Sequence, residues 1–211
     1  MSFGKVFILG DSYSTFKGYI PEDHAPWYWE GGHDATDVER VEQTWWKRLI
    51  DETDSELLLN CSWSGTTIGN TGYNGEDYTE ISFIGRLKKL IEKGYFKENK
   101  PDTLLLFGGT NDSWSGAPVG ELQYGDWTKE DLFKVLPAFC YLVDLIRKEL
   151  PDTKLVVIVN TELSEPITKG FQEGSKAYGA TCVMLEKIDK IAGHPSVAGM
   201  KKISDQIIKG V

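Results

Sequence analysis

The sequence predicts a three-layer α/β/α sandwich built on a five-stranded parallel sheet. Short apolar runs alternate five times with segments of helical spacing, and several of the runs end in glycine or small polar residues. Such alternation implies parallel strands with helices on both faces, a doubly wound, flavodoxin-like arrangement. No linker, repeat or low-complexity segment divides the 211 residues. Residues 1–211 are therefore expected to form a single domain.

The first half of the chain is expected to contain two strands and two helices. The apolar run at 6–9 is too short for a buried helix and is followed at once by Gly10, so it predicts a strand. Helical spacing of two Trp, a Leu and an Ile predicts a helix at 44–53, with both Trp in the core. A second strand follows at 57–60, and a second amphipathic helix at 81–91.

The second half continues the alternation. A long helical segment ends where Pro151 cannot continue it, and the last helix is expected to begin at Pro195. In chain order, the predicted elements are a strand at 103–107, a helix at 129–150, a strand at 155–159, a weaker helix at 168–177, a strand at 182–185 and a helix at 195–208.

Composition and charge narrow the classes of partner. The formal net charge is −9, and the acidic residues are spread along the chain. Such a surface repels nucleic acid and anionic lipid, so neutral substrates are favoured. No segment approaches the roughly 20 apolar residues of a membrane span, so no membrane insertion is expected. The three Cys are far apart, which argues against a structural metal site or a redox motif.

Two long polar and aromatic segments interrupt the regular pattern, at about 17–43 and 113–127. Loops of this length inside a compact domain usually bind a ligand or cover a site. Both are predicted to be insertions that lie over the active site.

Four residues that suit acyl transfer fall near the ends of predicted strands. Ser12 follows the first strand, Gly65 the second and Asn111 the third, while His194 precedes the last helix. In a parallel sheet these positions meet at one edge, where ligands collect. Ser12 is the candidate nucleophile, and His194 is the base that a weakly nucleophilic hydroxyl requires.

The same edge offers three donors for an oxyanion hole. They are the backbone N–H groups of Ser12 and Gly65 and the side-chain amide of Asn111. Donors aimed at the negative charge of a tetrahedral intermediate are usually worth a few kcal/mol each. A glycine at position 65 also lets the backbone approach a substrate closely. Asp11 is expected to brace the turn rather than to take part in catalysis.

These motifs resemble the ordered blocks of the SGNH hydrolase (GDSL-type esterase/lipase) superfamily. The blocks are Gly-Asp-Ser at 10–12, Asn-Cys-Ser-Trp-Ser-Gly at 60–65, Gly-Gly-Thr-Asn-Asp at 108–112 and Gly-His-Pro-Ser at 193–196. The resemblance covers most of the chain. It implies the SGNH hydrolase fold and hydrolysis of esters or thioesters, with Ser, Gly, Asn and His in the roles given above. It also implies that no metal or organic cofactor takes part.

The sequence departs from the family pattern at one position. The family usually has an Asp three residues before the His, where this chain has Ile191; the nearest upstream acid is Asp189. Asp189 could still reach the far ring nitrogen and complete a triad. Alternatively, a backbone carbonyl orients the ring in a Ser–His dyad, and Asp189 is a solvated charge between Lys187 and Lys190.

The substrate is predicted from the aromatic residues of the loops. Large aromatics with a polar tip favour half-wet binding surfaces, and sugar rings stack on them. We therefore expect a short-chain ester, most plausibly O-acetyl on a carbohydrate, as in the carbohydrate esterases that the chain resembles. The candidate substrate-binding residues are Trp63, Trp114, Trp27 and Trp29.

Other functions remain open from sequence alone. A lysophospholipase or acyl thioesterase would act on longer acyl groups, and a catalytically silent carbohydrate-binding module would keep the fold without turnover. The sequence does not define the oligomeric state. Nor does it define the compartment, which is cytoplasmic or, if a signal peptide has been removed, periplasmic or secreted.

Overall fold

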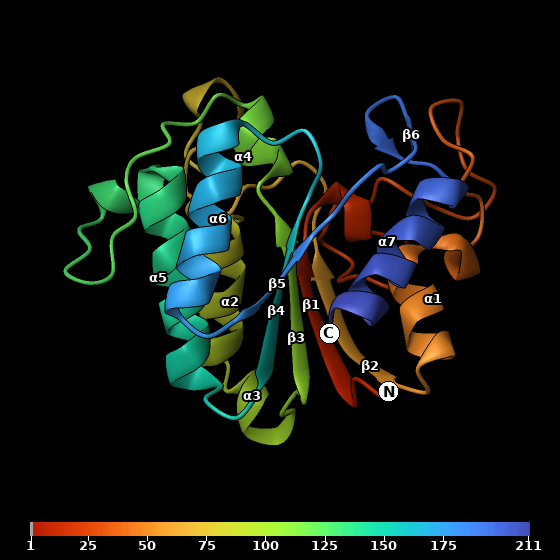
Figure 1. Cartoon of the computed structure of the whole chain (residues 1–211), viewed down its shortest axis with the longest axis horizontal. Coiled ribbons are helices and arrows are strands. Elements are labelled where there is room, and N and C mark those ends of the chain that lie inside the picture. Colours follow the sequence, from red (N-terminus) through yellow and green to blue (C-terminus); the bar gives the residue numbers. More distant parts are fainter. Residues whose placement is uncertain (1) are drawn as a thin grey trace.

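The computed structural model describes residues 2–211 and contains the predicted five-stranded parallel sheet. The strand order is β2-β1-β3-β4-β5, with every neighbouring pair parallel (Figure 1). The strands are β1 (Lys5–Gly10), β2 (Glu56–Ser62), β3 (Thr103–Gly108), β4 (Lys154–Val159) and β5 (Thr181–Met184).

Helices cover both faces of this sheet. On one face lie α1 (Trp45–Glu52) and α7 (Val197–Gly210), and on the other α2 (Phe83–Glu92), α5 (Val135–Glu149) and α6 (Glu165–Ala177) (Figure 1). Two short helices, α3 (Tyr95–Glu98) and α4 (Thr110–Trp114), were not predicted. The short 3-10 helices are η1 (Ser12–Ser14), η2 (Val41–Gln43), η3 (Tyr73–Gly75) and η4 (Glu130–Phe133).

The central strands supply both hydrophobic cores. In β1, Phe7 and Leu9 face the core beneath α2 and α5, while Val6 and Ile8 face the core beneath α1 and α7. This alternation explains why the strand is a continuous apolar run rather than an alternating one. The two predicted core residues of α1, Trp45 and Trp46, are buried as expected.

The weaker helix predicted at 168–177 begins three residues earlier, at Glu165, and two other predicted helix starts differ in a way that changes the local structure. The helix predicted at 129–150 is interrupted at Lys134, whose backbone is extended, so η4 precedes α5. Pro137 lies in the first turn of α5, where its missing N–H costs no helical hydrogen bond. The predicted start of the last helix at Pro195 is wrong. That residue belongs to the short strand β7 (His194–Pro195), which pairs antiparallel with β6 (Lys190–Ile191).

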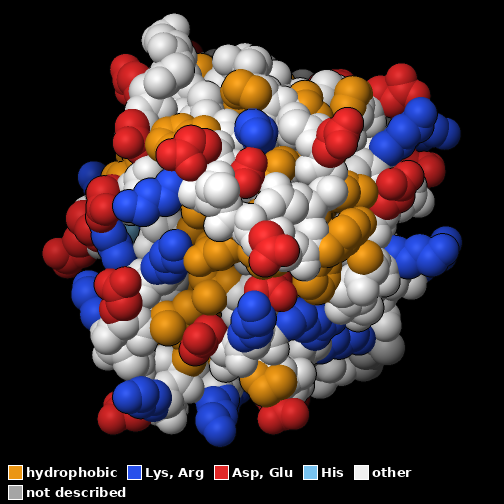
Figure 2. Space-filling model, turned by 90° about the vertical axis from the view of Figure 1, so that its left-hand side faces the viewer, with side chains coloured by type: hydrophobic (Ala, Val, Ile, Leu, Met, Phe, Trp, Pro, Cys, Tyr) orange, Lys and Arg blue, Asp and Glu red, His pale blue; other side chains and the backbone are white. Residues whose placement is uncertain are grey.

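The carboxyl ends of the strands meet at the upper edge of the sheet in Figure 1, near α4 and β6. The turns after β1, β2 and β3 and the loop after β5 therefore share one end of the molecule. Figure 2 shows the side on which α5 lies, where acidic and basic side chains are interspersed with apolar ones. Across residues 2–211, no helix combines the length and apolar character needed to cross a membrane.

Candidate active site

The nucleophile candidate lies in a tightly supported turn. Ser12 begins η1 directly after β1, and the Asp11 carboxylate accepts a hydrogen bond from the backbone N–H of Tyr13 at 3.0 Å. The indole N–H of Trp45 donates to the Tyr13 carbonyl at 3.1 Å. Asp11 therefore braces the turn, as predicted. Its complete burial raises its pKa to about 7.

Gly10 allows this turn to pack against the end of β2. A Cβ at position 10 would lie 2.6 Å from the Ser62 hydroxyl and 2.7 Å from the Ser14 hydroxyl, closer than side chains tolerate. Asn60 links the same two segments, because its amide donates to the Ser14 carbonyl at 2.7 Å and accepts from the Ser62 hydroxyl at 2.6 Å.

Ser12 and His194 form a hydrogen-bonded pair, although 182 residues separate them in the chain. The distance from Ser12 Oγ to His194 Nε2 is 3.0 Å. Both are nearly enclosed, with exposed fractions of 3% and 7%. Burial disfavours the charged imidazolium and lowers the pKa of His194 to about 4. The imidazole is therefore neutral at pH 7 and can accept a proton.

The other ring nitrogen of His194 faces a backbone carbonyl. His194 Nδ1 lies 3.2 Å from the Ala192 oxygen. Because a carbonyl only accepts hydrogen bonds, this contact requires the proton on Nδ1 and leaves the Nε2 lone pair toward Ser12. The structure brings Ser12 and His194 together with a carbonyl rather than a carboxylate behind the ring.

Asp189 is directed elsewhere. Its carboxylate lies 2.6 Å from Lys202 Nζ on α7, and it is about half exposed. The hydrogen bond with Lys202 lowers the pKa of Asp189. The Asp189 backbone carbonyl accepts from the N–H of Ser196 at 2.9 Å, which anchors the β6–β7 hairpin. Of the two sequence-based alternatives for this residue, the geometry favours the solvated charge.

Two buried tyrosines hold the carbonyl groups on either side of His194. The Tyr13 hydroxyl donates to the Gly193 oxygen at 2.5 Å, and the Tyr28 hydroxyl donates to the Pro195 oxygen at 3.1 Å. Ala192 and Gly193 both have positive φ, 46° and 79°, a backbone conformation rare outside glycine. The unusual backbone is thus held by contacts with the N-terminal third of the chain.

Trp27 covers one face of the His194 ring. The two rings are stacked with centroids 3.7 Å apart and an interplanar angle of 9°. Trp114 approaches the same ring edge-on, with centroids 5.9 Å apart at 77°. Trp114 is 44% exposed, so much of its ring faces solvent beside the Ser–His pair.

Each of the three candidate oxyanion donors, Ser12, Gly65 and Asn111, has an N–H group that donates no hydrogen bond within the described residues. Among residues 2–211, neither the Ser12 nor the Gly65 backbone N–H donates to another protein group. Gly65 has φ of +80°, so a side chain here would be strained although nothing lies within 4 Å of the added Cβ. Asn111 Nδ2 donates to the Thr66 carbonyl at 2.9 Å, which leaves its second N–H free.

Buried charged groups support this side of the site, and sequence reasoning missed them. The Asp112 carboxylate accepts from the backbone N–H groups of Ile68 and Gly69, and burial raises its pKa to about 6. The fully buried Arg86 guanidinium donates to the carbonyls of Gly10 and Cys61, at the ends of β1 and β2. No local motif in the sequence signals these contacts, because each joins distant segments.

Comparison with known proteins decides the family. The model of the family described as GDSL-like Lipase/Acylhydrolase matches residues 4–211. The chain belongs to this family. It is an ester hydrolase with the SGNH-type fold. A search of the curated proteins found no match.

Solved structures agree with this assignment. A candidate GDSL-like lipase from Bacteroides ovatus is 42% identical, with a TM-score of 0.92 over 99% of this chain and 98% of that one. Another from Bacteroides uniformis is 44% identical, with a TM-score of 0.91 over 99% and 95%. A family two carbohydrate esterase from Clostridium thermocellum, in complex with cellohexaose, shares the fold at 15% identity, with a TM-score of 0.65 over 98% and 62%.

The remaining aromatic candidates of this GDSL-like hydrolase pack against histidines. Trp63 stacks on His24 with centroids 4.4 Å apart, and Trp29 stacks on His33 at 4.5 Å. His33 Nε2 also lies 3.0 Å from the Trp27 carbonyl oxygen. The contacts of His33 therefore join parts of the 17–43 segment to one another, and the stacking of His24 on Trp63 joins the segment to the end of β2.

The segment at 113–127 divides into two parts. Trp114 lies at the His194 ring, as described above. From Val119 onward the segment packs on α5 and α6: Leu122 joins the core beneath them, and Trp127 meets Tyr141 edge-on at 5.4 Å. The second part therefore contacts helices rather than the Ser–His pair.

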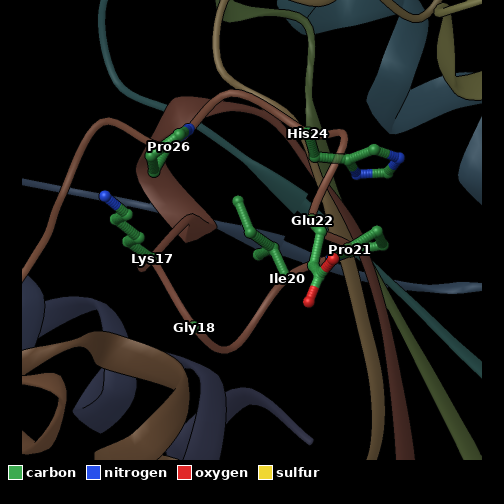
Figure 3. Close-up of a pocket in the computed structure, with 7 residues that line it drawn as sticks. All are labelled: Lys17, Gly18, Ile20, Pro21, Glu22, His24 and Pro26. Atoms are coloured by element: carbon green, nitrogen blue, oxygen red, sulfur yellow. The ribbon is translucent and has the colours of Figure 1, made fainter.

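A cavity of about 440 Å³ lies inside the loop that enters the 17–43 segment (Figure 3). Its lining includes Lys17, Ile20, Glu22 and Pro26, and does not include Ser12 or His194. The cavity is therefore separate from the Ser12–His194 pair. His24 also lines the cavity. Within the described residues, no group of three or more His, Cys, Asp or Glu could hold a metal ion.

Proposed function

We propose that this hydrolase is a serine esterase that removes short acyl groups, specifically O-acetyl, from a carbohydrate. The observation that carries the proposal is the 3.0 Å contact between Ser12 Oγ and His194 Nε2, with the opposite ring nitrogen on a carbonyl. This is the arrangement that a hydroxyl needs to become a nucleophile at neutral pH.

The first half of the reaction forms an acyl-enzyme. The Ser12 hydroxyl proton moves to His194 Nε2 as Oγ attacks the ester carbonyl carbon. Negative charge develops on the former carbonyl oxygen, where the N–H groups of Ser12 and Gly65 and the Asn111 amide would receive it. The intermediate then collapses: the bond to the sugar oxygen breaks, and His194 returns its proton to that oxygen.

Water completes the cycle. His194 accepts a proton from a water molecule as the water oxygen attacks the acyl carbon. The second tetrahedral intermediate expels Ser12 Oγ, which recovers its proton from His194. The carboxylic acid leaves, and the starting state is restored.

A Ser–His dyad is the form of the site that the contacts support. Each time Nε2 gains a proton, the Nδ1–H group remains bonded to the Ala192 carbonyl, which fixes the ring. The face of Trp27 adds a π-system against the imidazolium, an arrangement that stabilises a cation. Asp189, paired with Lys202, is assigned no part in the reaction.

Two features favour a short acyl group on a neutral sugar. The Ser12 side chain is almost enclosed, which suits a small acyl group better than a long chain. Among the described residues, Trp114 and Ile191 are the large apolar side chains exposed near His194, and of these Trp114 offers a ring face for a sugar. The structural likeness to proteins named as carbohydrate esterases and an acetyl xylan esterase supports this choice.

A longer acyl chain is the competing substrate class, because the two Bacteroides proteins described above are lipase candidates by name. The test is initial-rate hydrolysis of nitrophenyl acetate, butyrate and octanoate by the intact protein and by Ser12→Ala. We expect acetate to be preferred and the Ser12→Ala rate to equal background. A preference for octanoate would replace the acetylesterase with a lipase or thioesterase, and turnover that survives Ser12→Ala would overturn the assigned nucleophile.

A further inference from the structure

The oxyanion amide is held by a residue that lies outside the four sequence blocks. Asn111 is the second residue of α4. The helix begins directly after Gly109, whose φ of 92° turns the chain from β3 into the helix. The Tyr73 hydroxyl donates to Asn111 Oδ1 at 2.8 Å. Tyr73 comes from η3, in the connection between β2 and α2.

The hydrogen bonds of the Asn111 side chain account for all but one of its donors and acceptors. The amide has one acceptor oxygen and two N–H donors. Its oxygen accepts from Tyr73, and one N–H donates to the Thr66 carbonyl at 2.9 Å. A flipped amide would place its oxygen against that carbonyl, so the orientation is fixed. One N–H group remains without a protein partner.

We propose that Tyr73 is a positioning residue for the oxyanion hole. Together with the Thr66 carbonyl, its hydroxyl locks the Asn111 amide so that the free N–H faces the developing negative charge. The inference rests on the proposed function, since it gives a role to a group that acts only through Asn111. A hydrogen bond to the amide oxygen also polarises the amide and makes its N–H a stronger donor.

The segment that carries Tyr73 is anchored firmly enough for this role. Near its start, the Asn70 N–H donates to the Leu132 carbonyl and its carbonyl accepts from the Tyr78 N–H, both at 2.8 Å. Within it, the Gly72 N–H donates to the Glu76 carbonyl at 2.8 Å. A preorganised donor loses less energy to reorientation during the reaction than a mobile one.

The Tyr73 hydroxyl keeps its proton, and so remains a hydrogen-bond donor, at neutral pH. Partial burial raises the pKa of Tyr73 above its ordinary value of 10. The proton that bonds Asn111 is therefore retained at any pH at which a histidine base operates. The acid–base state of Tyr73 does not have to change during the cycle.

The chain offers a matched control for the removal of this hydroxyl. Tyr78 belongs to the same connection, and its ring packs against Gly72. Within residues 2–211, its hydroxyl has no hydrogen-bond partner in the protein. Tyr78→Phe therefore removes a hydroxyl from the same segment without touching Asn111.

The experiment measures kcat and KM for nitrophenyl acetate in a double-mutant cycle. Tyr73→Phe is expected to lower kcat roughly three- to tenfold, the worth of one hydrogen bond, with KM nearly unchanged. Asn111→Ala is expected to lower kcat by about 10²-fold or more. Adding Tyr73→Phe to Asn111→Ala should then change nothing further, because Tyr73 acts through the amide. Tyr78→Phe should match the wild type.

Two results would overturn the inference. If Tyr73→Phe leaves kcat unchanged, the hydroxyl does not position the amide. If Tyr73→Phe raises KM and the effect persists in the Asn111→Ala background, Tyr73 contacts the substrate itself. Ser12→Ala and Asn111→Ala, measured in the same series, separate these results from a failure of the proposed function, because both would then retain activity.

Discussion

Two segments on opposite sides of Ser12 carry the other proposed catalytic groups. Residues 189–195, the base loop, carry the proposed base, His194, and the helix α4 carries Asn111, the proposed oxyanion donor. The His194 ring and the two carbonyls that flank it are contacted by neutral groups: the hydroxyls of Tyr13 and Tyr28 and the ring of Trp27. The ion pairs of this segment, Asp189–Lys202 and Lys190–Glu162, lie at its beginning. The oxyanion side is held by fully buried charges, Asp112 and Arg86.

The two sides of Ser12 differ in the role of their carboxylates. On the oxyanion side, a buried carboxylate accepts backbone N–H groups and fixes a loop. On the base side, the nearest acid in the chain, Asp189, pairs with a surface lysine, and a backbone carbonyl takes the place behind the imidazole. The family is recognised by its Ser, Gly, Asn and His blocks, whereas the groups that hold the His ring differ from the usual pattern.

The largest effect is expected from the buried charge on the oxyanion side. Arg86→Met would remove the guanidinium donors to the carbonyls of Gly10 and Cys61 and should lower the free energy of unfolding by about 3 kcal/mol or more, measured by urea denaturation. Lys89→Met, on the same helix but in an exposed ion pair with Glu80, should change it by less than about 1 kcal/mol. Equal losses in the two variants would show that the buried guanidinium has no special role.

A smaller effect is expected from the neutral contacts of the base loop. Tyr28→Phe removes one hydroxyl and leaves the Pro195 carbonyl without its donor, so it should cost about 1 kcal/mol in the free energy of unfolding. Since the same contact fixes the loop of His194, kcat for nitrophenyl acetate should fall while KM stays nearly constant. Tyr19→Phe is a suitable control, because Tyr19 is exposed and its hydroxyl bonds no group in residues 2–211. A kcat equal to that of the wild type would remove Tyr28 from the support of the base.

The positions of the candidate site residues could be predicted from sequence, whereas the contacts that support them could not. Ser12, Gly65 and Asn111 were predicted to lie together because each comes within a few residues of a strand's carboxyl end, and parallel strands bring such positions to one edge. The supporting contacts could not be predicted, because they join residues far apart in the chain: Tyr28 and Pro195 are separated by 167 positions. Periodicity and capping signals act over a few residues and carry no information on such pairs.

Asp189 illustrates the same limit at short range. Its spacing from His194 allowed two orientations, and the choice depends on the β6–β7 hairpin and on Lys202 in α7. Neither was predicted, since the hairpin strands are only two residues long. The predicted helix start at Pro195 concealed the hairpin, and with it the backbone that presents the Ala192 carbonyl.

The central claim, a Ser–His pair that works without a carboxylate, is tested most directly by the pH dependence of kcat/KM for nitrophenyl acetate in the wild type and in Asp189→Ala. Nitrophenol release would be followed where its two protonation states absorb equally. In the proposed mechanism the neutral form of His194 is the base, so activity should persist well below pH 6.5 and be lost only as the pH falls through the lowered pKa of about 4. The account predicts superimposable profiles for the two proteins. A large loss of rate in Asp189→Ala, or a shift of its acid limb, would contradict the account and restore Asp189 to the catalytic machinery.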